Sequence, residues 1–244
     1  MEEKTTSLKK TARIAGLWYL LLAITGAYSI IYVPSQIIAR GDAVTTAKNM
    51  LANEFLFRTG IVSNLISVTL FLFLVLVLYR LFKQVNERQA KLMVALVIVQ
   101  IPAVFIMEAF NITSLMILKG EILKTFELTQ RQDLAMLFLK INDYGVLTLE
   151  IFWGLWLFPL ALLVYRSRFL PRFLGVWLII NGFAYLAISF TGLLLPRYED
   201  MVSNIAWPAI FGELAFMLWI LVKGVNVQRW KEQASTAGAS EEMK

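Results

Sequence analysis

The chain contains no histidine and no cysteine. Without histidine it cannot form a Ser-His catalytic triad, a zinc site of the HExxH type or an imidazole proton shuttle. Without cysteine it has no disulfides, thiolate nucleophiles or Fe–S ligands. Acid–base chemistry would have to use carboxylates, Lys, Arg or Tyr. We therefore expect no enzyme, no catalytic residues and no cofactor.

Charged residues are also scarce. They make up only 16% of the 244 residues, whereas 59% are apolar and the mean hydropathy is +0.68. Soluble chains are about 45–50% apolar, and a helix needs about 20 apolar residues to cross a membrane. The pattern predicts an all-α integral membrane bundle of six transmembrane helices within 14–224, at about 14–33, 60–79, 92–118, 145–165, 173–195 and 205–222.

The basic residues predict the orientation of the bundle. If both termini are cytoplasmic, the cytoplasmic segments 1–13, 79–91, 165–172 and 223–244 hold 15 of the 23 Lys and Arg. Such an excess is typical of cytoplasmic segments. The net charge of +6 then indicates contact with anionic headgroups of a plasma membrane, and not a nucleic acid partner. Residues 225–244 lack an apolar period and are expected to be a disordered tail.

Two outer loops show helix signals. Asp42 is a plausible N-cap for an amphipathic helix over 43–57, with Val44, Ala47, Leu51 and Phe55 at helical spacing, lying in the outer interface. In the second loop, Thr129 and Gln132 suggest a capping box that opens a helix toward the fourth span. We expect that helix to break around 142–145.

Prolines lie inside three of the spans. Pro102, Pro159 and Pro208 are each expected to free the carbonyl four residues earlier, at Ile98, Leu155 and Asn204. Kinks at these positions could open the bundle, although spans also tolerate proline for packing reasons.

The most informative residues are three glutamates inside the spans, Glu108, Glu150 and Glu213. A carboxylate at membrane depth is costly unless it is paired, protonated or hydrated. All three are predicted to lie between the outer leaflet and the midplane, which suggests one shared, outward-facing cavity. A protonated glutamate that only bonds to a carbonyl is the main alternative.

Other polar side chains complete the candidate site. Asn111 shares a helix face with Glu108, Arg58 at the outer mouth is the expected counter-charge, and the remaining candidates are Asn64, Asn181 and Tyr185. Tyr28, Trp153, Trp177 and Tyr185 are expected to wall the cavity. The alternative for Asn64 and Asn181 is hydrogen bonding to neighbouring helices alone. Three converging carboxylates could hold a hard cation, but the sequence leaves any metal open.

Several sequence stretches resemble one family. These are Gly41-Asp42 through Phe57-Arg58, the run from Phe152 to Pro159, the run from Leu163 to Gly175, and Leu218 to Gly224. Together they resemble the bacterial domain of unknown function 4386 family over about 10–225. The resemblance implies a multi-pass bacterial membrane protein, and it brings no activity or site residues with it.

Three classes of function remain open. The first is binding or translocation of a small cationic or amphipathic ligand through the polar cavity. The second is a membrane sensor, regulator or scaffold that acts through protein partners, and the third is an intramembrane enzyme based on carboxylates. Convergence of the glutamates on one cavity would favour the first class. The sequence does not indicate an oligomeric state.

Overall fold

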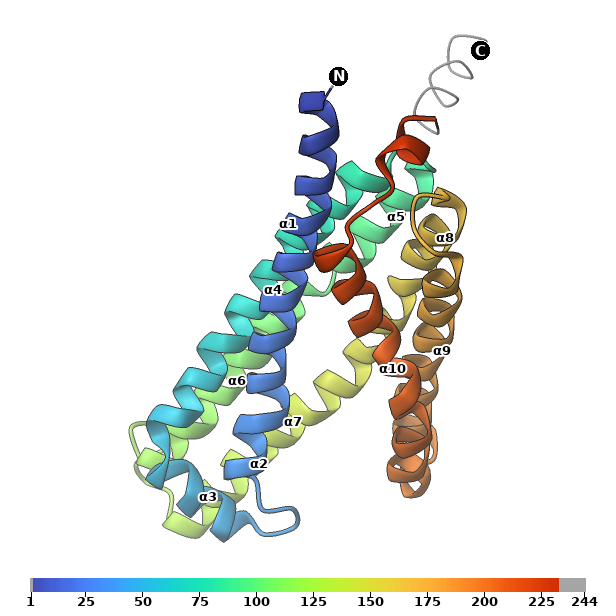
Figure 1. The fold of residues 1–244 in the computed structure, drawn as a ribbon. Helices are drawn as coiled ribbons and strands as arrows, with labels where there is room; N and C mark the ends of the chain where they lie inside the picture. Colours follow the sequence, from blue (N-terminus) through green and yellow to red (C-terminus); the bar gives the residue numbers. More distant parts are fainter. Residues whose placement is uncertain (1, 233–244) are drawn as a thin grey trace. The chain divides into compact units, whose positions relative to one another are not determined.

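The computed structural model describes residues 2–232, with side chains from Leu8 onward, and over these residues the chain forms helices and no strands (Figure 1). Six helical segments in this range are long and apolar enough to cross a membrane. They are Leu8–Ile37, Glu54–Phe82, Glu87–Lys119, Leu128–Ser167, Arg172–Leu194 and Pro196–Val222. The predicted all-α architecture with six candidate spans is confirmed.

The chain divides into two compact units. Unit 1 comprises the described parts of Met1–Leu20, Phe71–Gln100 and Leu147–Lys244, and unit 2 comprises Leu21–Leu70 and Ile101–Val146. The elements are α1 (Glu2–Ala27), a π-helical turn η1 (Tyr28–Tyr32), α2 (Val33–Ile37), α3 (Ala43–Ala52), α4 (Glu54–Phe82), α5 (Glu87–Ile98), α6 (Ile101–Lys119), α7 (Leu128–Leu155), α8 (Leu157–Ser167), α9 (Arg172–Leu194), the 3₁₀ turn η2 (Pro196–Tyr198) and α10 (Glu199–Val222). The helices α1, α4 and α7 contribute residues to both units.

Large apolar side chains cover the outside of the helices. Leu194, Ile205 and Phe183 are 75%, 73% and 61% exposed in the absence of a membrane. A soluble chain would not leave so many such groups in water, whereas lipid tails cover them at no cost. The chain is a multi-pass membrane protein.

The first span is longer than predicted, because Pro34 does not end it. Pro34 has no N–H to donate to the preceding turn. The helix instead widens into the π-turn, where the Val33 N–H donates to the Tyr28 carbonyl, and then continues as α2 to Ile37. This turn was not predicted from the sequence.

The other prolines act differently from one another. The third span is interrupted after Ile98, before Pro102, and the fourth after Leu155, before Pro159, and these are the two residues at which the sequence predicted freed carbonyls. Pro208 lies inside α10, which continues without interruption. The freed Asn204 carbonyl and a kink at this proline stay predictions.

The first outer loop contains the predicted helix. The Asp42 carboxylate accepts the Thr45 N–H at 2.9 Å and so caps α3. However, α3 ends at Ala52, and its buried residues are Thr46, Ala47 and Met50. Val44, Leu51 and Phe55 are exposed, so of the predicted apolar face only Ala47 packs inward.

The helix of the second outer loop also differs from the prediction. No Thr129–Gln132 capping box is found. The helix begins at Leu128, so Glu127 precedes its first residue, and the Gln130 side-chain oxygen accepts the Glu127 N–H. The expected break at 142–145 is absent. The helix α7 is continuous from Leu128 to Leu155, since Gly145 keeps a helical conformation there.

Unit 2 is held together by an apolar cluster and by polar contacts between helices. The Ser63 and Ser67 hydroxyls of α4 donate to the carbonyls of Thr25 and Leu22, and the Tyr28 and Thr59 hydroxyls lie 2.8 Å apart. The helix α3 packs on α2 and α6. The buried cluster is Val33, Ile37, Ala47, Met50, Phe57, Leu115, Ile117, Leu118, Ala135 and Leu139.

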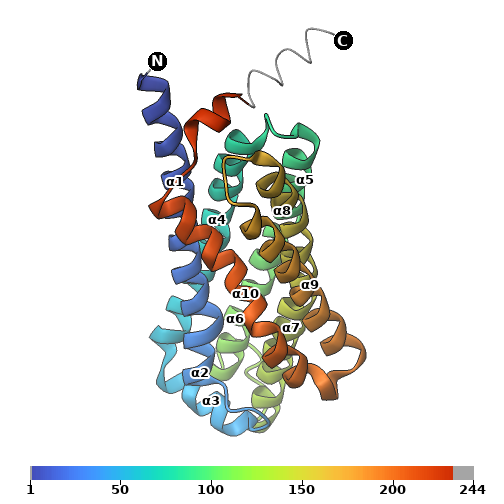
Figure 2. The ribbon, with the colours of Figure 1, turned by 45° about the vertical axis from the view of Figure 1, so that its right-hand side comes forward.

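Unit 1 is built on close helix packing around α9. In both views of the ribbon α9 lies beside α10, and it also packs on α8 (Figure 2). A methyl group on Gly154 would lie 2.6 Å from the Gly182 carbonyl oxygen, so α7 and α9 approach closely at these glycines. The Ser189 hydroxyl donates to the Leu147 carbonyl at 2.6 Å and ties α9 to α7 again.

The predicted disordered tail begins too early. Residues 227–232 are helical, and Val225 and Val227 are buried. The Trp230 indole donates to the Leu81 carbonyl at 3.2 Å. This part of the chain packs within unit 1 because it carries apolar anchors. The rest of the predicted tail, 233–244, lies outside the described residues.

Candidate functional site

Glu108 lies on α6 in unit 2 and is only 5% exposed. Each of its carboxylate oxygens accepts an amide N–H. Asn64 of α4 donates to one at 2.5 Å, and Asn111, one turn further along α6, donates to the other at 2.9 Å. Both partners are neutral amides, which satisfy hydrogen bonds without neutralising the charge. The sequence predicted all three residues as part of one site, and the structure brings them together.

These three residues line a cavity of about 230 Å³ in unit 2. Its other polar residues include Asn142 and Asp143 of α7. Most of the remaining lining is apolar and comes from the first span, α4 and α7, namely Ile30, Val33, Pro34, Ile37, Ile38, Phe57, Ile61, Leu139 and Val146. The cavity therefore combines a polar floor with apolar walls.

The rim of this cavity lies on α7. The Asp143 side chain is 49% exposed and lies 3.6 Å from the Lys140 ammonium. Asn142 beside it is half-buried. Because α7 is continuous through this stretch, both side chains are held on a rigid helix at the edge of the cavity. Glu108 lies deeper, so the cavity carries one exposed carboxylate and one buried carboxylate.

Glu213, on α10 in unit 1, has a different set of partners. Its carboxylate accepts hydrogen bonds from the Tyr19 hydroxyl of α1 and from the Asn181 amide of α9 at 3.3 Å, and the Tyr185 hydroxyl of α9 lies near it. Tyr19 and Asn181 are buried, and Glu213 is half-buried. The structure thus joins three predicted residues, Asn181, Tyr185 and Glu213.

Tyr19 was not predicted as a site residue. Its ring packs against Trp156 and Phe216, at centroid distances of 6.2 Å in each case. In the sequence, Tyr19 follows Trp18 at the start of an apolar run, where an aromatic pair is typical of a membrane interface. The contact of Tyr19 with Glu213 on another helix could not be predicted from the sequence, because it depends on how the helices pack.

Glu150 lies on α7, also in unit 1, and forms no ion pair among the described residues. One of its carboxylate oxygens is buried without a hydrogen-bond partner. Tyr185 lies within electrostatic range of both Glu150 and Glu213, and its ring packs edge-on to Trp153 at 5.8 Å. Glu150 therefore borders the Glu213 cluster without joining its hydrogen bonds.

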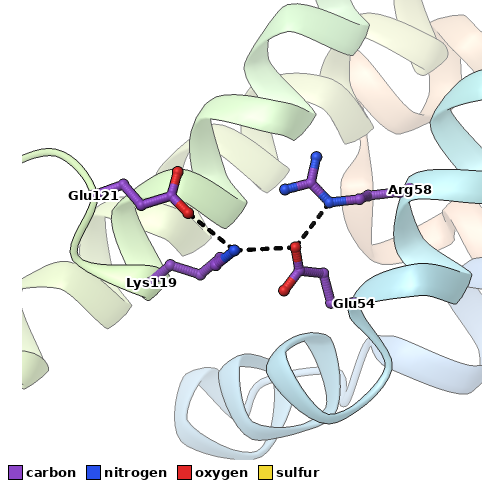
Figure 3. Close-up of polar contacts among 4 residues, drawn as sticks. All are labelled: Glu54, Arg58, Lys119 and Glu121. Carbon is purple, nitrogen blue, oxygen red and sulfur yellow. Dashed lines mark hydrogen bonds and ion pairs between the residues drawn. The ribbon is translucent and has the colours of Figure 1, made fainter.

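Arg58 is not the counter-charge that the sequence predicted. Its guanidinium lies 2.8 Å from Glu54, one turn earlier on α4 (Figure 3). Lys119 at the end of α6 contacts Glu54 at 3.1 Å and Glu121 at 2.9 Å. Arg58 thus belongs to a partly exposed network of two acidic and two basic residues. It pairs there because an acidic residue lies four positions away on the same helix.

The predicted aromatic walls are also absent from this cavity. Phe57 is the aromatic residue in its lining, whereas Trp153, Trp177 and Tyr185 belong to unit 1 and Tyr28 packs on the apolar cluster of unit 2. Glu108 belongs to unit 2 but Glu150 and Glu213 to unit 1. A single cavity for all three glutamates stays a prediction. Within residues 2–232, no group of three His, Cys, Asp or Glu could hold a metal.

Comparison with known proteins gives a family but no activity. A family model described as a domain of unknown function, DUF4386, matches residues 14–224. An uncharacterized protein from Archaeoglobus fulgidus is 34% identical over 90 residues, which cover 35% of this chain and 52% of that protein. The chain thus spans about half the length of this relative. No solved structure matches the chain.

Proposed function

Since the chain belongs to the DUF4386 family, whose description assigns no activity, we propose a function from the site itself: the unit 2 cavity binds a small amphipathic cation. The observation that carries this proposal is the buried Glu108 carboxylate on the floor of an apolar-walled cavity. Binding could serve translocation, for which the same site would hold the ligand midway.

The charge of the cavity favours a cation. Glu108 has two neutral amide partners, and the Asp143 carboxylate at the rim lies 3.6 Å from the Lys140 ammonium. A buried carboxylate without a counter-charge is costly. A ligand ammonium 4 Å from it would gain about 4 kcal/mol at an effective dielectric constant of about 20. A primary ammonium has three N–H donors, and Glu108 and the two asparagine carbonyls offer acceptors for them.

The size and walls of the cavity favour a small, partly apolar ligand. Its volume of about 230 Å³ is below the roughly 300–1,000 Å³ of pockets for drug-sized molecules. Aliphatic side chains form most of the wall, so a short alkyl chain fits better than a strongly hydrated ion.

The enzyme hypothesis receives no comparable support from this cavity. Ser29 is the hydroxyl residue in its lining, and its hydroxyl donates to the Gly26 carbonyl. The chain has no histidine or cysteine to activate it or to replace it. We therefore propose binding without covalent turnover. A membrane sensor or scaffold is the alternative if the cavity binds no cation.

We also propose that both termini lie in the cytoplasm of a plasma membrane. The split of 15 basic residues against 8 supports this orientation. A second cavity, of about 600 Å³ in unit 1, adds support because four cationic side chains line it and no acidic one does: Lys9, Arg168, Lys223 and Arg229. Such a pocket suits anionic lipid headgroups on the cytoplasmic side.

Cysteine labelling tests the orientation on a background with no native cysteine. Lys48 on α3 and Arg88 on α5 are exposed and suit the experiment. We expect an impermeant maleimide to label Lys48→Cys in intact cells, and Arg88→Cys only after lysis. Labelling of Arg88→Cys alone in intact cells would reverse the orientation.

Ligand binding is tested with hexylammonium, and 1-hexanol serves as its uncharged analogue. Isothermal titration of the purified protein in nanodiscs should show saturable binding of hexylammonium and much weaker binding of 1-hexanol. Glu108→Gln should weaken hexylammonium binding by at least about tenfold, which corresponds to 1.4 kcal/mol of the Coulomb gain.

Glu150→Gln is the matched control, since it removes a half-buried carboxylate from unit 1 with the same chemical change. It should leave hexylammonium binding within about twofold of the original value. Equal binding of hexylammonium and 1-hexanol, or binding that Glu108→Gln does not alter, contradicts the proposal and favours the sensor or scaffold.

A further inference from the structure

The Glu213 cluster of unit 1 contains a buried oxygen without a partner. Asn181 is completely buried. Its amide nitrogen donates to the Ile210 carbonyl at 3.4 Å and to Glu213 at 3.3 Å, while its side-chain oxygen has no hydrogen-bond partner. A buried acceptor that is left unsatisfied destabilises the folded state.

The orientation of this amide is fixed by its surroundings. The Ile210 carbonyl can only accept a hydrogen bond, so the Asn181 nitrogen must face it. Turning the amide over would bring its oxygen against that carbonyl and would lose the contact. The unpartnered oxygen is therefore a property of the site, and it belongs to the same amide group that contacts Glu213.

The cluster also lacks a positive charge. The contacts to Glu213 come from two tyrosine hydroxyls and one amide, and none of the ion pairs found among residues 8–232 involves this glutamate. A donor at each carboxylate oxygen suits the ionised form of Glu213, which accepts hydrogen bonds at both oxygens. An ionised carboxylate in this position needs one compensating charge.

A proton on Glu213 would supply the charge but would not complete the site. On the oxygen next to Asn181, the proton would point at an N–H donor. The Asn181 oxygen would also stay without a partner, because the nitrogen of that amide is the atom facing Glu213. A cation held between the Glu213 carboxylate and the Asn181 oxygen would answer both needs at once.

We infer that Glu213, the Asn181 side-chain oxygen and the hydroxyls of Tyr19 and Tyr185 bind one small monovalent cation, with Na⁺ as the ion expected. The Tyr19 hydroxyl donates its proton to Glu213 and keeps lone pairs for the ion, and the nearby Tyr185 hydroxyl also has lone pairs to offer. All the ligands are hard oxygen atoms, which suit an alkali cation. One carboxylate balances one positive charge, whereas divalent sites use more oxygen ligands or retain water.

The ligands come from three helices of unit 1, which gives the ion a structural consequence. Tyr19 lies on α1, Asn181 and Tyr185 on α9, and Glu213 on α10. An ion that bridges these helices stabilises the folded unit by mass action, since the unfolded chain has no such site. Na⁺ binding is therefore measurable as a shift in melting temperature as well as directly.

The experiment measures thermal unfolding and ²²Na⁺ binding of the purified protein in nanodiscs. NaCl is replaced by KCl or by N-methyl-D-glucamine chloride at constant ionic strength. The wild type should melt at a higher temperature in NaCl and should bind ²²Na⁺ in a saturable way. Glu213→Gln should weaken ²²Na⁺ binding by at least about tenfold, because it removes the one formal charge among the ligands.

Two further variants keep the test decisive. Tyr185→Phe retains the ring that packs on Trp153 and removes only the hydroxyl, so it should fold and weaken ²²Na⁺ binding several-fold. Glu108→Gln, in the other unit, should leave ²²Na⁺ binding unchanged. In the hexylammonium experiment Glu108→Gln is the variant expected to lose binding, and a glutamate variant of unit 1 is the control. Either proposal can therefore fail without the other.

Three results would overturn the inference. The first is a melting temperature and ²²Na⁺ binding that do not depend on Na⁺. The second is a Na⁺ effect that survives in Glu213→Gln and in Tyr185→Phe. The third is stabilisation by acidic pH alone, equal in NaCl and in N-methyl-D-glucamine chloride, which would identify a protonated Glu213 in place of an ion site.

Discussion

Each unit holds a glutamate among its helices, buried in unit 2 and half-buried in unit 1, and the two units surround it differently. Glu108 in unit 2 has two amide partners and faces a cavity of about 230 Å³ with aliphatic walls. Glu213 in unit 1 has two tyrosine hydroxyls and an amide, with a buried amide oxygen beside it. The first arrangement leaves space for an organic cation, whereas the second gathers oxygen atoms from three helices. The same residue type thus suits a different ligand in each unit.

The largest expected effect comes from separating α7 and α9 in unit 1. In Gly154→Val the added Cβ would lie 2.6 Å from the Gly182 backbone oxygen, which cannot rotate away. We expect a loss of about 3 kcal/mol of stability, the upper end for overpacking. ²²Na⁺ binding should weaken because Asn181 adjoins Gly182, and hexylammonium binding in unit 2 should persist.

Gly26→Ala is the matched control for this substitution in unit 2. Its Cβ would meet only the Ser67 hydroxyl oxygen at 3.3 Å, which can move. Alanine is also the better helix former, by about 0.8–1.0 kcal/mol. Melting curves in nanodiscs that show equal losses for Gly154→Val and Gly26→Ala would contradict the close packing of α7 on α9.

A smaller effect is expected from the amides around Glu108. Asn64→Ala removes one of the two hydrogen-bond donors and leaves a carboxylate oxygen of Glu108 without its partner. The expected loss is about 1–2 kcal/mol, from the cost of an unsatisfied buried group. Hexylammonium should restore part of this loss, because its N–H groups can replace the amide.

The comparison with unit 1 provides the control here. Asn181→Ala removes an amide from Glu213 in the same way, and hexylammonium should not stabilise that variant. Melting temperatures with and without hexylammonium distinguish the two cases. Rescue of both variants, or of neither, would remove the proposed difference between the units.

The smallest effect concerns the cap of α3 in unit 2. Hydrogen bonds from the Thr45 hydroxyl and N–H hold the pKa of Asp42 below its ordinary value of 3.8. A carboxyl with a lowered pKa in the folded state stabilises the protein above the ordinary pKa, and this contribution is lost as the pH falls through the lowered value. Asp42→Asn should therefore flatten the fall in melting temperature below about pH 4.

The helix α5 of unit 1 has an equivalent cap that cannot titrate. Asn86 accepts the Gln89 N–H at 3.0 Å, as Asp42 accepts that of Thr45. Asn86→Ser should lower the melting temperature slightly and by the same amount at pH 7 and at pH 3. A pH profile that Asp42→Asn leaves unchanged would show that this cap does not contribute.

The sequence was sufficient for features that depend on local chemistry. Apolar runs predicted the six candidate spans, and Asp42 predicted the cap of α3. Pro102 and Pro159 predicted freed carbonyls at Ile98 and Leu155, where two helices end. The grouping of Glu108 with Asn111 followed from their separation of three residues on one helix. Such features need no knowledge of which helices are neighbours.

Features that depend on helix neighbours were not predictable from one sequence. Arg58 was expected to be the counter-charge of the glutamates inside the spans, but it forms an ion pair with Glu54 on the same helix. Tyr19 was missed because its role depends on α10 lying within reach. The π-turn before Pro34 reflects competition between a missing N–H and the packing of α2 on α3, which the sequence does not show.

The most direct test is a binding experiment that crosses two ligands with two variants. Hexylammonium and ²²Na⁺ are titrated separately into the wild type, Glu108→Gln and Glu213→Gln in nanodiscs. We predict that Glu108→Gln weakens only hexylammonium binding and that Glu213→Gln weakens only ²²Na⁺ binding, each by at least about tenfold. If either variant weakens both ligands equally, or if neither ligand binds the wild type, the assignment of a separate cation site to each unit is wrong.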